Sequence, residues 1–202
     1  KKNDEVSEEA IMVVGRRKLT NVLPDLEPLL TNESQKIRAV SAAAILHFET
    51  GPSKRAESIL NEMLDSDDEL VQATALKRLV HNDSILPQDK LIHFLENEGP
   101  LISNVALTIA GKRNEPELVP AIISNLNFPK TSLQARLMLN KFSDDLIMEE
   151  FQKLIASPNL SRKLRLGIIR TLREYPNDQT IDILLLLLNR EDQDVYNEVV
   201  DS

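Results

Sequence analysis

One apolar pattern recurs along this chain and constrains its fold more than any other feature. Each copy opens with an apolar residue, or with threonine in one case, and five of the six complete copies have a small residue four positions later. The copies begin at Val6, Ile37, Val71, Ile102, Thr131 and Leu164, and Val195 begins a seventh, so neighbouring starts lie 29 to 34 residues apart. Such a period is typical of repeat proteins, in which one unit buries its apolar face only by stacking on the next.

A second apolar series lies between these copies. It ends at Leu30, Leu64, Leu95, Leu126, Ile155 and Leu188, and its spacing follows that of the first series. The last complete copy shows the unit clearly, because Leu164, Ile168 and Leu172 repeat at helical spacing and a Pro–Asn–Asp turn follows at residues 176–178. The two interleaved series predict pairs of helices repeated along the chain.

These patterns predict a lone second helix, five complete pairs and a last, interrupted pair. We expect the helices at residues 4–18, 21–31, 35–49, 53–65, 69–81, 86–97, 100–113, 116–127, 130–142, 145–156, 160–174 and 178–189. Pro24, Pro28 and Pro120 fall early in first helices, where a missing N–H costs least, so we expect only modest bends there. No low-complexity linker interrupts the series, so residues 1–202 are expected to form a single domain.

The composition supports an all-α fold. Aromatic residues make up only 3% of the chain and Trp is absent, so the core must consist of Leu, Ile, Val and Ala, which suit closely packed helices. With 5 Gly and 10 Pro, the chain has too few turn formers for an all-β protein. Phe48, Phe128, Phe142, Phe151 and Tyr175 lie mostly next to turns and are expected to seal the joints between repeats.

Several classes of protein are disfavoured by charge and residue usage. The net charge of -8 opposes general affinity for DNA or an anionic membrane. The absence of cysteine excludes disulfides and thiolate metal sites. No apolar run reaches the roughly 18 residues that a transmembrane helix needs. There is no signal peptide and no initiator Met, so we expect a cytoplasmic location and a piece of a longer chain, interrupted at Ser202.

Particular residues resemble the HEAT repeat, a helical-hairpin module of α-solenoids. Residues 22–30 (VLPDLEPLL) followed by Ile37–Arg38 match its first-helix and Val-Arg pattern, and residues 65–79 (DSDDELVQATALKRL) form the most similar single unit. The resemblance implies an all-α fold, an α-α superhelix (right-handed solenoid) of about six HEAT-like helical hairpins. It also implies an Asp–Arg ladder between repeats, which Gln72 interrupts and of which Arg38 and Arg165 are the clearest members.

A narrower resemblance indicates the kind of protein to which such a domain is attached. Residues 106–111, 117–126 and 162–188 look like HEAT segments attached to bacterial membrane transporters related to the nucleotide (ATP/ADP) carriers. This resemblance implies a cytoplasmic domain tethered to the inner membrane through a domain that this chain lacks. The chain itself is not expected to insert into the membrane.

Catalytic and metal motifs are poorly supported by the sequence. The three histidines, His47, His81 and His93, are far apart, and no Gly-rich phosphate loop is present. The acidic pairs lie at or near helix starts, where the helix dipole favours carboxylates without any catalytic role. We therefore expect neither an enzyme nor a bound cofactor or metal ion.

One column of the aligned repeats is rich in basic residues. Ten residues after the starts stand Arg16, His47, His81, Lys112 and Lys141, followed by Glu174, which breaks the series. We call the first five the cation row. In a HEAT-like array the second helices line the concave face, so the row is a candidate site for an acidic peptide or a phosphate group. The alternative is that each cation simply stabilises the last turn of its helix, by about 0.3 to 1 kcal/mol.

A second group of basic residues lies within one expected helix. It consists of Arg162, Lys163, Arg165, Arg170 and Arg173. A solvated helix face would explain most of this charge. However, Arg162 and Lys163 stand near the helix start, where the dipole disfavours cations. These two are therefore the first residues to test for partner binding.

The sequence favours a non-enzymatic protein-interaction scaffold. Its partner would be another protein or another domain of the same chain, and we expect no nucleic-acid partner. The alternatives are a HEAT-like DNA glycosylase, which would need a basic concave surface with aromatic residues, and a chromophore-lyase-type enzyme. Duplex-DNA titration at low salt and absorbance after mixing with tetrapyrroles separate these alternatives from the scaffold.

Overall fold

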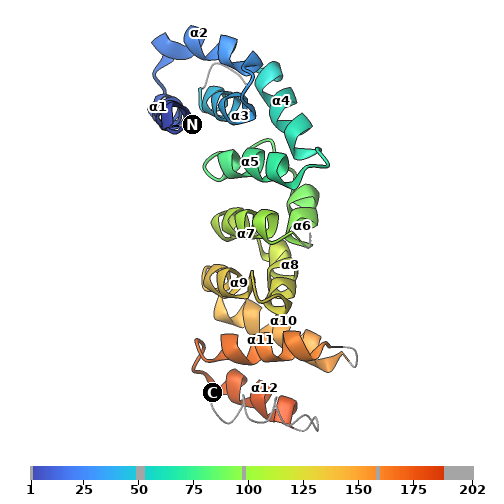
Figure 1. Cartoon of the computed structure of the whole chain (residues 1–202). Helices are drawn as coiled ribbons and strands as arrows, with labels where there is room; N and C mark the ends of the chain where they lie inside the picture. The colour runs from blue at the N-terminus through green and yellow to red at the C-terminus, as the bar shows by residue number, and fades with distance from the viewer. Residues whose placement is uncertain (1, 49–52, 97–98, 158–159, 189–202) are drawn as a thin grey trace. The chain divides into compact units, whose positions relative to one another are not determined.

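The structure, a computed structural model, describes residues 2–48, 53–96, 99–157 and 160–188, with side chains from residue 7 to residue 187. These residues form twelve α-helices and four short 3-10 helices, with no strand among them (Figure 1). The predicted all-α class is confirmed. The helix expected to begin near Val195 lies outside the described residues.

Contacts between residues divide the chain into two units, residues 1–90 and 91–202. The first contains α1 (Lys2–Arg16), α2 (Leu23–Leu26), α3 (Gln35–Ile45), α4 (Lys54–Leu64) and α5 (Glu69–Leu79), and α6 (Gln88–Glu96) crosses the boundary. The second contains α7 (Pro100–Arg113), α8 (Val119–Ser124), α9 (Ser132–Leu139), α10 (Asp144–Ala156), α11 (Arg162–Leu172) and α12 (Asp178–Leu188).

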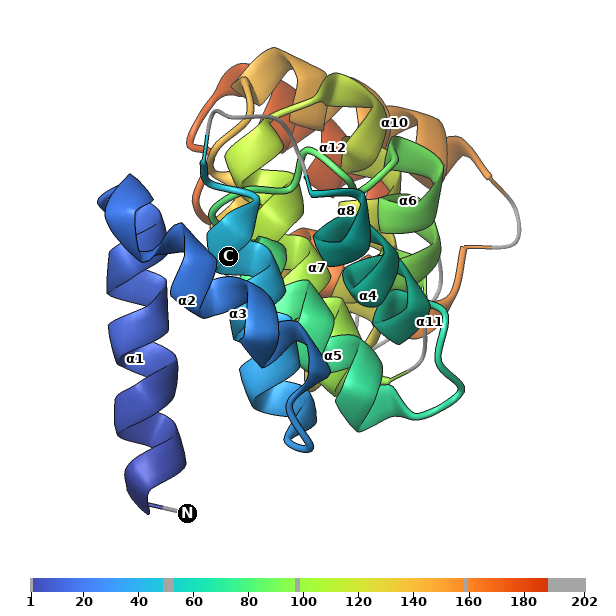
Figure 2. The ribbon, with the colours of Figure 1, turned by 90° about the horizontal axis from the view of Figure 1, so that it is seen from above.

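In the first unit, α3 is the central helix and packs against α1, α4 and α5. Its residues 39–45 are all buried, and five of these seven are Ala or Ser, which lets the neighbouring helices approach closely. Gly15 of α1 lies so near α3 that a Cβ on it would come within 2.7 Å of the Ala44 Cα. Figure 2 shows α1 beside α3 at the blue end of the chain.

In the second unit, α9 packs between α7 and α8, and α10 packs against α8 and α12. The 3-10 helix η4 (Asn125–Asn127) joins α8 to the turn before α9 and lies against α11. Helices from neighbouring predicted pairs are therefore in contact within this unit, as Figure 1 shows for α7 and α9.

The two apolar series form the core, as the repeat pattern predicts. Ser41, Ala75, Ala106, Ala135 and Ile168, which lie four residues after the starts of their copies, are all fully buried. The second series is buried as well, at Leu30, Leu64, Leu95, Leu126 and Ile155. Ala10 is the exception, because it is exposed on α1.

The proline-containing first helices differ from the prediction. The single helices expected at residues 21–31 and 116–127 are each broken into a short α-helix flanked by 3-10 helices: η1 (Thr20–Val22), α2 and η2 (Glu27–Thr31) in one case, and η3 (Pro116–Leu118), α8 and η4 in the other. Pro24 and Pro28 stand at the first or second position of α2 and η2, and Pro120 does so in α8. Because proline lacks an N–H and its ring crowds the preceding turn, it ends one segment and begins the next rather than bending a continuous helix.

Arg38 and Gln72, which each follow a repeat start, have a different role from the expected ladder. The Arg38 guanidinium donates to the carbonyls of Asn32 at 2.6 Å and Glu33 at 3.1 Å, which lie in the turn inside its own pair. The Gln72 amide likewise donates to the Leu64 carbonyl at 3.2 Å. These side chains satisfy carbonyls at or just after the end of the preceding helix, so Arg38 does not bridge neighbouring repeats as the resemblance implies.

Candidate functional site

The first unit holds three members of the cation row, Arg16, His47 and His81. Arg16 and His81 are exposed, and His47 is half-buried just after the end of α3. Burial, and then the positive charges of Arg16 and Lys18, lower the pKa of His47 below its usual value. Its Nε2 is buried and has no hydrogen-bond partner among the described residues. His47 is therefore neutral at pH 7 and adds no positive charge to the row.

The second unit holds Lys112 and Lys141, both exposed near the ends of their helices. The next position in the column is Glu174, whose carboxylate accepts a hydrogen bond from the Asn140 amide at 2.6 Å. The same carboxylate lies 3.8 Å from the Arg136 guanidinium. Glu174 thus breaks the row because it ties the segment after α11 to α9.

The basic residues of α11 do not all face the same way. Arg162, Lys163, Arg170 and Arg173 are exposed, and Arg165 is half-buried. Lys163 and Arg170 line a surface cleft between α9 and α11, whereas the other three do not. Only Lys163 and Arg170 of the predicted basic group on this helix therefore line the cleft.

The cleft has a volume of about 300 Å³. It is lined by Leu126, Asn127, Pro129, Ser132, Arg136, Lys163, Leu166, Gly167 and Arg170. Three of these residues are cations and none is acidic, so we call it the basic cleft. Arg136 comes from α9, and Lys163 and Arg170 come from α11; both helices pack against η4.

Gly167 explains why α11 lies so close to the opposite wall of the basic cleft. A Cβ at this position would come within 2.7 Å of the Leu126 carbonyl oxygen and 2.8 Å of the Leu126 Cβ. Lys163 lies about one turn before Gly167 and Arg170 about one turn after it. The glycine therefore lets α11, which carries both cations, lie directly against η4.

Arg136 is the residue of the basic cleft that our sequence analysis missed. The equivalent positions of the other copies, five residues after each start, hold Ile11, Ala42, Leu76, Leu107 and Ile169, all of which are buried. Arg136 is thus the single charged residue in an otherwise apolar column, and the sequence alone could have singled it out. Its charge indicates that α9 is rotated or exposed differently from its counterparts.

A hydrogen-bond network holds the far end of α9 and α11 together. The Tyr175 hydroxyl donates to the Asn140 Oδ1 at 2.8 Å. Burial, and then the negative charges of Asp144 and Glu174, raise the pKa of Tyr175 to about 12. Tyr175 therefore stays protonated near neutral pH and keeps Asn140 oriented towards Glu174.

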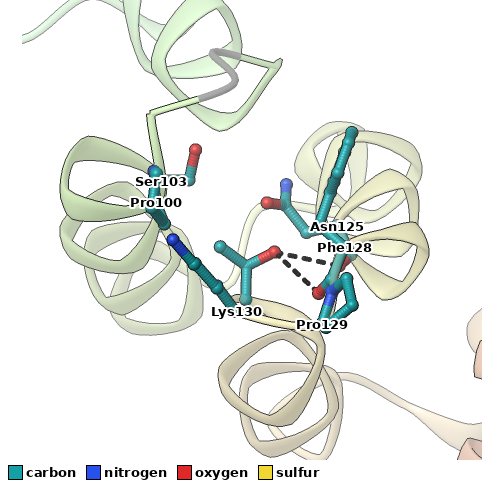
Figure 3. Close-up of a pocket in the computed structure, with 7 residues that line it drawn as sticks. Pro100, Ser103, Asn125, Phe128, Pro129 and Lys130 are labelled. Atoms are coloured by element: carbon teal, nitrogen blue, oxygen red, sulfur yellow. Dashed lines mark hydrogen bonds between the residues drawn. The ribbon is translucent and has the colours of Figure 1, made fainter.

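A second pocket, of about 290 Å³, lies beside the first residues of α7 and the turn before α9. It is lined by Pro100, Ser103, Asn125, Phe128, Pro129, Lys130 and Thr131 (Figure 3). We call it the apolar pocket, because proline and phenylalanine rings form much of its wall. In Figure 3 the Lys130 side chain extends towards Pro100. The Thr131 hydroxyl donates to the carbonyls of Asn125 at 3.0 Å and Phe128 at 3.4 Å. Pro129 lines both this pocket and the basic cleft, so the two sites are neighbours.

Two leucines on α9 add an exposed apolar surface. Leu133 is 60% exposed and Leu137 is 49% exposed, and their spacing of four places them on one face of the helix. Phe128, predicted to seal a joint, is also 40% exposed, whereas Phe48, Phe142, Phe151 and Tyr175 are buried as expected. The exposed side chains of α9 and its preceding turn are therefore unusually apolar for a surface next to a charged cleft.

The described residues contain no group of three or more His, Asp or Glu side chains that converge to hold a metal ion. None of the described helices combines the length and the apolar character needed to cross a bilayer. Comparisons with known protein families and with curated proteins find no match to this chain. The basic cleft and the apolar pocket of the second unit are therefore the candidate sites.

Proposed function

We propose that the chain is a non-enzymatic protein-interaction scaffold. In this proposal the helical hairpins stack as HEAT-type repeats into a right-handed α-solenoid, and the second helices present side chains to the partner. The burial of both repeat series and the contacts between helices of neighbouring pairs support this arrangement.

The observation that carries the proposal is the basic cleft with the exposed leucines beside it. Three cations without an acidic neighbour among the lining residues favour an acidic partner. Leu133 and Leu137 supply the apolar surface that an interface needs near its centre. We infer that the partner is an acidic segment of another protein, or of another domain of the same protein, as expected for a transporter-associated HEAT domain.

A displayed library of random peptides tests this function. We expect the wild-type chain to enrich acidic peptides with apolar residues, and the Lys163→Glu/Arg170→Glu variant to lose them by at least about tenfold. Lys36→Glu/Lys77→Glu is the matched control, because both residues are exposed cations of the first unit outside the cation row. A Lys112→Glu/Lys141→Glu variant shows whether the cation row contributes.

Three outcomes would contradict the proposal. Equal loss of peptides in the cleft variant and in the matched control would show that only net charge matters. Tight, salt-sensitive binding of duplex DNA would instead favour the glycosylase alternative, and a tetrapyrrole absorbance shift would favour the chromophore-lyase type.

A further inference from the structure

We propose that the basic cleft recognises a phosphorylated serine or threonine in the partner protein, an inference that rests on the proposed scaffold function. Charge is the first observation in its favour. Arg136, Lys163 and Arg170 line about 300 Å³ together with no acidic residue, and the Glu174 carboxylate lies 3.8 Å from Arg136. A cationic lining of this kind suits a phosphate group of -1.5 to -2 better than a single carboxylate. Two of the three cations are arginines, which bind phosphate oxygens in a bidentate manner.

The fold also leaves hydrogen-bond donors available at the cleft. The Lys163 side chain has no ion pair or hydrogen bond to any described residue. The Ser161 hydroxyl donates to the Asn127 Oδ1 at 2.8 Å, which orients the amide of Asn127 and leaves its Nδ2 without a partner among the described residues. A phosphate offers three acceptor oxygens, so the cleft supplies donors of the number and kind that it needs.

Ser132, at the start of α9, also lines the basic cleft. The N-cap residue Thr131 does not cap this helix, because its hydroxyl donates to the Asn125 carbonyl at 3.0 Å. The first turn has no acidic residue, and the amides of Leu133 and Gln134 make no hydrogen bond to a described residue. This uncompensated positive end of a helix adds to the attraction for an anion.

The position of the apolar pocket favours a phosphorylated protein over a free phosphate or a lipid headgroup. The two sites share Pro129, so an extended segment can place its phosphorylated residue in the basic cleft and a nearby apolar side chain against Phe128. A net charge of -8 opposes adsorption to an anionic membrane. A free phosphate would leave the apolar pocket unused.

Degenerate peptides with a fixed central phosphoserine test the inference, alongside the same peptides with serine or glutamate at that position. Binding to the full 202-residue chain is measured by fluorescence anisotropy, and amide chemical shifts locate the site. We expect the phosphoserine peptides to bind at least about tenfold more tightly than the serine peptides. Lys163→Gln/Arg170→Gln should abolish this difference, whereas Lys36→Gln/Lys77→Gln should preserve it. The amides of Leu133 and Gly167 should shift on binding.

Each other result overturns the inference in a recognisable way. Equal binding of phosphoserine and serine peptides that still depends on Lys163 and Arg170 would refute phosphate recognition but leave the scaffold function standing. Preferential binding of inorganic phosphate, or of phosphatidylcholine vesicles containing phosphatidylinositol phosphate, would refute a protein partner at this cleft. No binding of any phosphate probe would refute the inference outright. Circular dichroism of both double variants excludes unfolding as the cause.

Discussion

Replacement of Gly167 by alanine should separate α11 from η4 and so widen the basic cleft. The added Cβ would stand 2.7 Å from the Leu126 carbonyl oxygen, whereas ordinary contacts begin at about 3.4 Å. One wall must therefore retreat by about 0.7 Å. Both obstructing groups, the carbonyl and the Cβ of Leu126, belong to the chain close to its backbone and cannot rotate away.

The energetic cost follows from two opposing effects. Alanine improves helix propensity by about 1 kcal/mol relative to glycine. Overpacking costs about 1 to 3 kcal/mol, and the rigid obstruction at Leu126 places Gly167→Ala at the upper end. We expect a net loss of about 2 kcal/mol, which corresponds to a melting temperature lower by about 4 to 8 °C.

Gly111→Ala is the matched control, because its added Cβ would meet chiefly the Met138 sulfur, the far end of a flexible side chain. Thermal unfolding followed by circular dichroism compares the two variants, and amide hydrogen exchange in α11 reports local loosening. Phosphopeptide affinity should fall in Gly167→Ala alone, because Lys163 and Arg170 move away from Arg136. An equally large loss of stability in Gly111→Ala, or a stabilised Gly167→Ala with unchanged affinity, would refute the reasoning.

Three further substitutions test the packing and electrostatics of the units. The neutral, half-buried His47 contributes stability that is complete above its unfolded pKa of about 6.5 and is lost as the pH falls below it, by at most about 1.4 kcal/mol per pH unit. His47→Gln should remove this component from the pH dependence of urea unfolding. Asn125→Leu should cost about 1 to 3 kcal/mol in the same assay, because the buried Asn125 amide donates to the Leu95 carbonyl at 2.8 Å. Arg78→Met should cost about 3 kcal/mol by leaving the mostly buried Glu8 carboxylate unpaired, and addition of Glu8→Gln should recover much of it.

The sequence was sufficient to predict the class and most of the core, because both depend on periodicity. Buried positions such as Ala106 and Leu126 follow from spacing alone. The segments around Pro24 and Pro120 were predicted less well, because the competition between α and 3-10 geometry depends on where each proline ring meets the preceding turn. Helix existence was therefore easier to predict than helix continuity.

The basic cleft was only partly predictable. Lys163 and Arg170 stood out as charges on one helix, but the repeat alignment cannot show which cations face a neighbouring helix. That choice depends on Gly167, whose missing side chain sets the distance between helices, and on Arg136, which occupies an otherwise apolar column. The helix dipole explains Lys112 and Lys141 as well as a binding role does, since both lie near helix ends.

Lys163 provides a test that separates folding from function. It lies in the first turn of α11, which contains no acidic residue, so its charge opposes the helix dipole. If this lysine served stability, its replacement by glutamate would lower the melting temperature. We expect the opposite: Lys163→Glu should stabilise the chain by about 1 kcal/mol, raising the melting temperature by about 2 to 4 °C, while phosphopeptide binding is lost. Lys112→Glu should instead lower the melting temperature and leave phosphopeptide binding intact, since Lys112 lies in the last turn of α7, where the dipole favours a cation. A destabilised Lys163→Glu variant would show that the cation is needed by the fold, and a stabilised variant with intact binding would remove the basic cleft from the functional site.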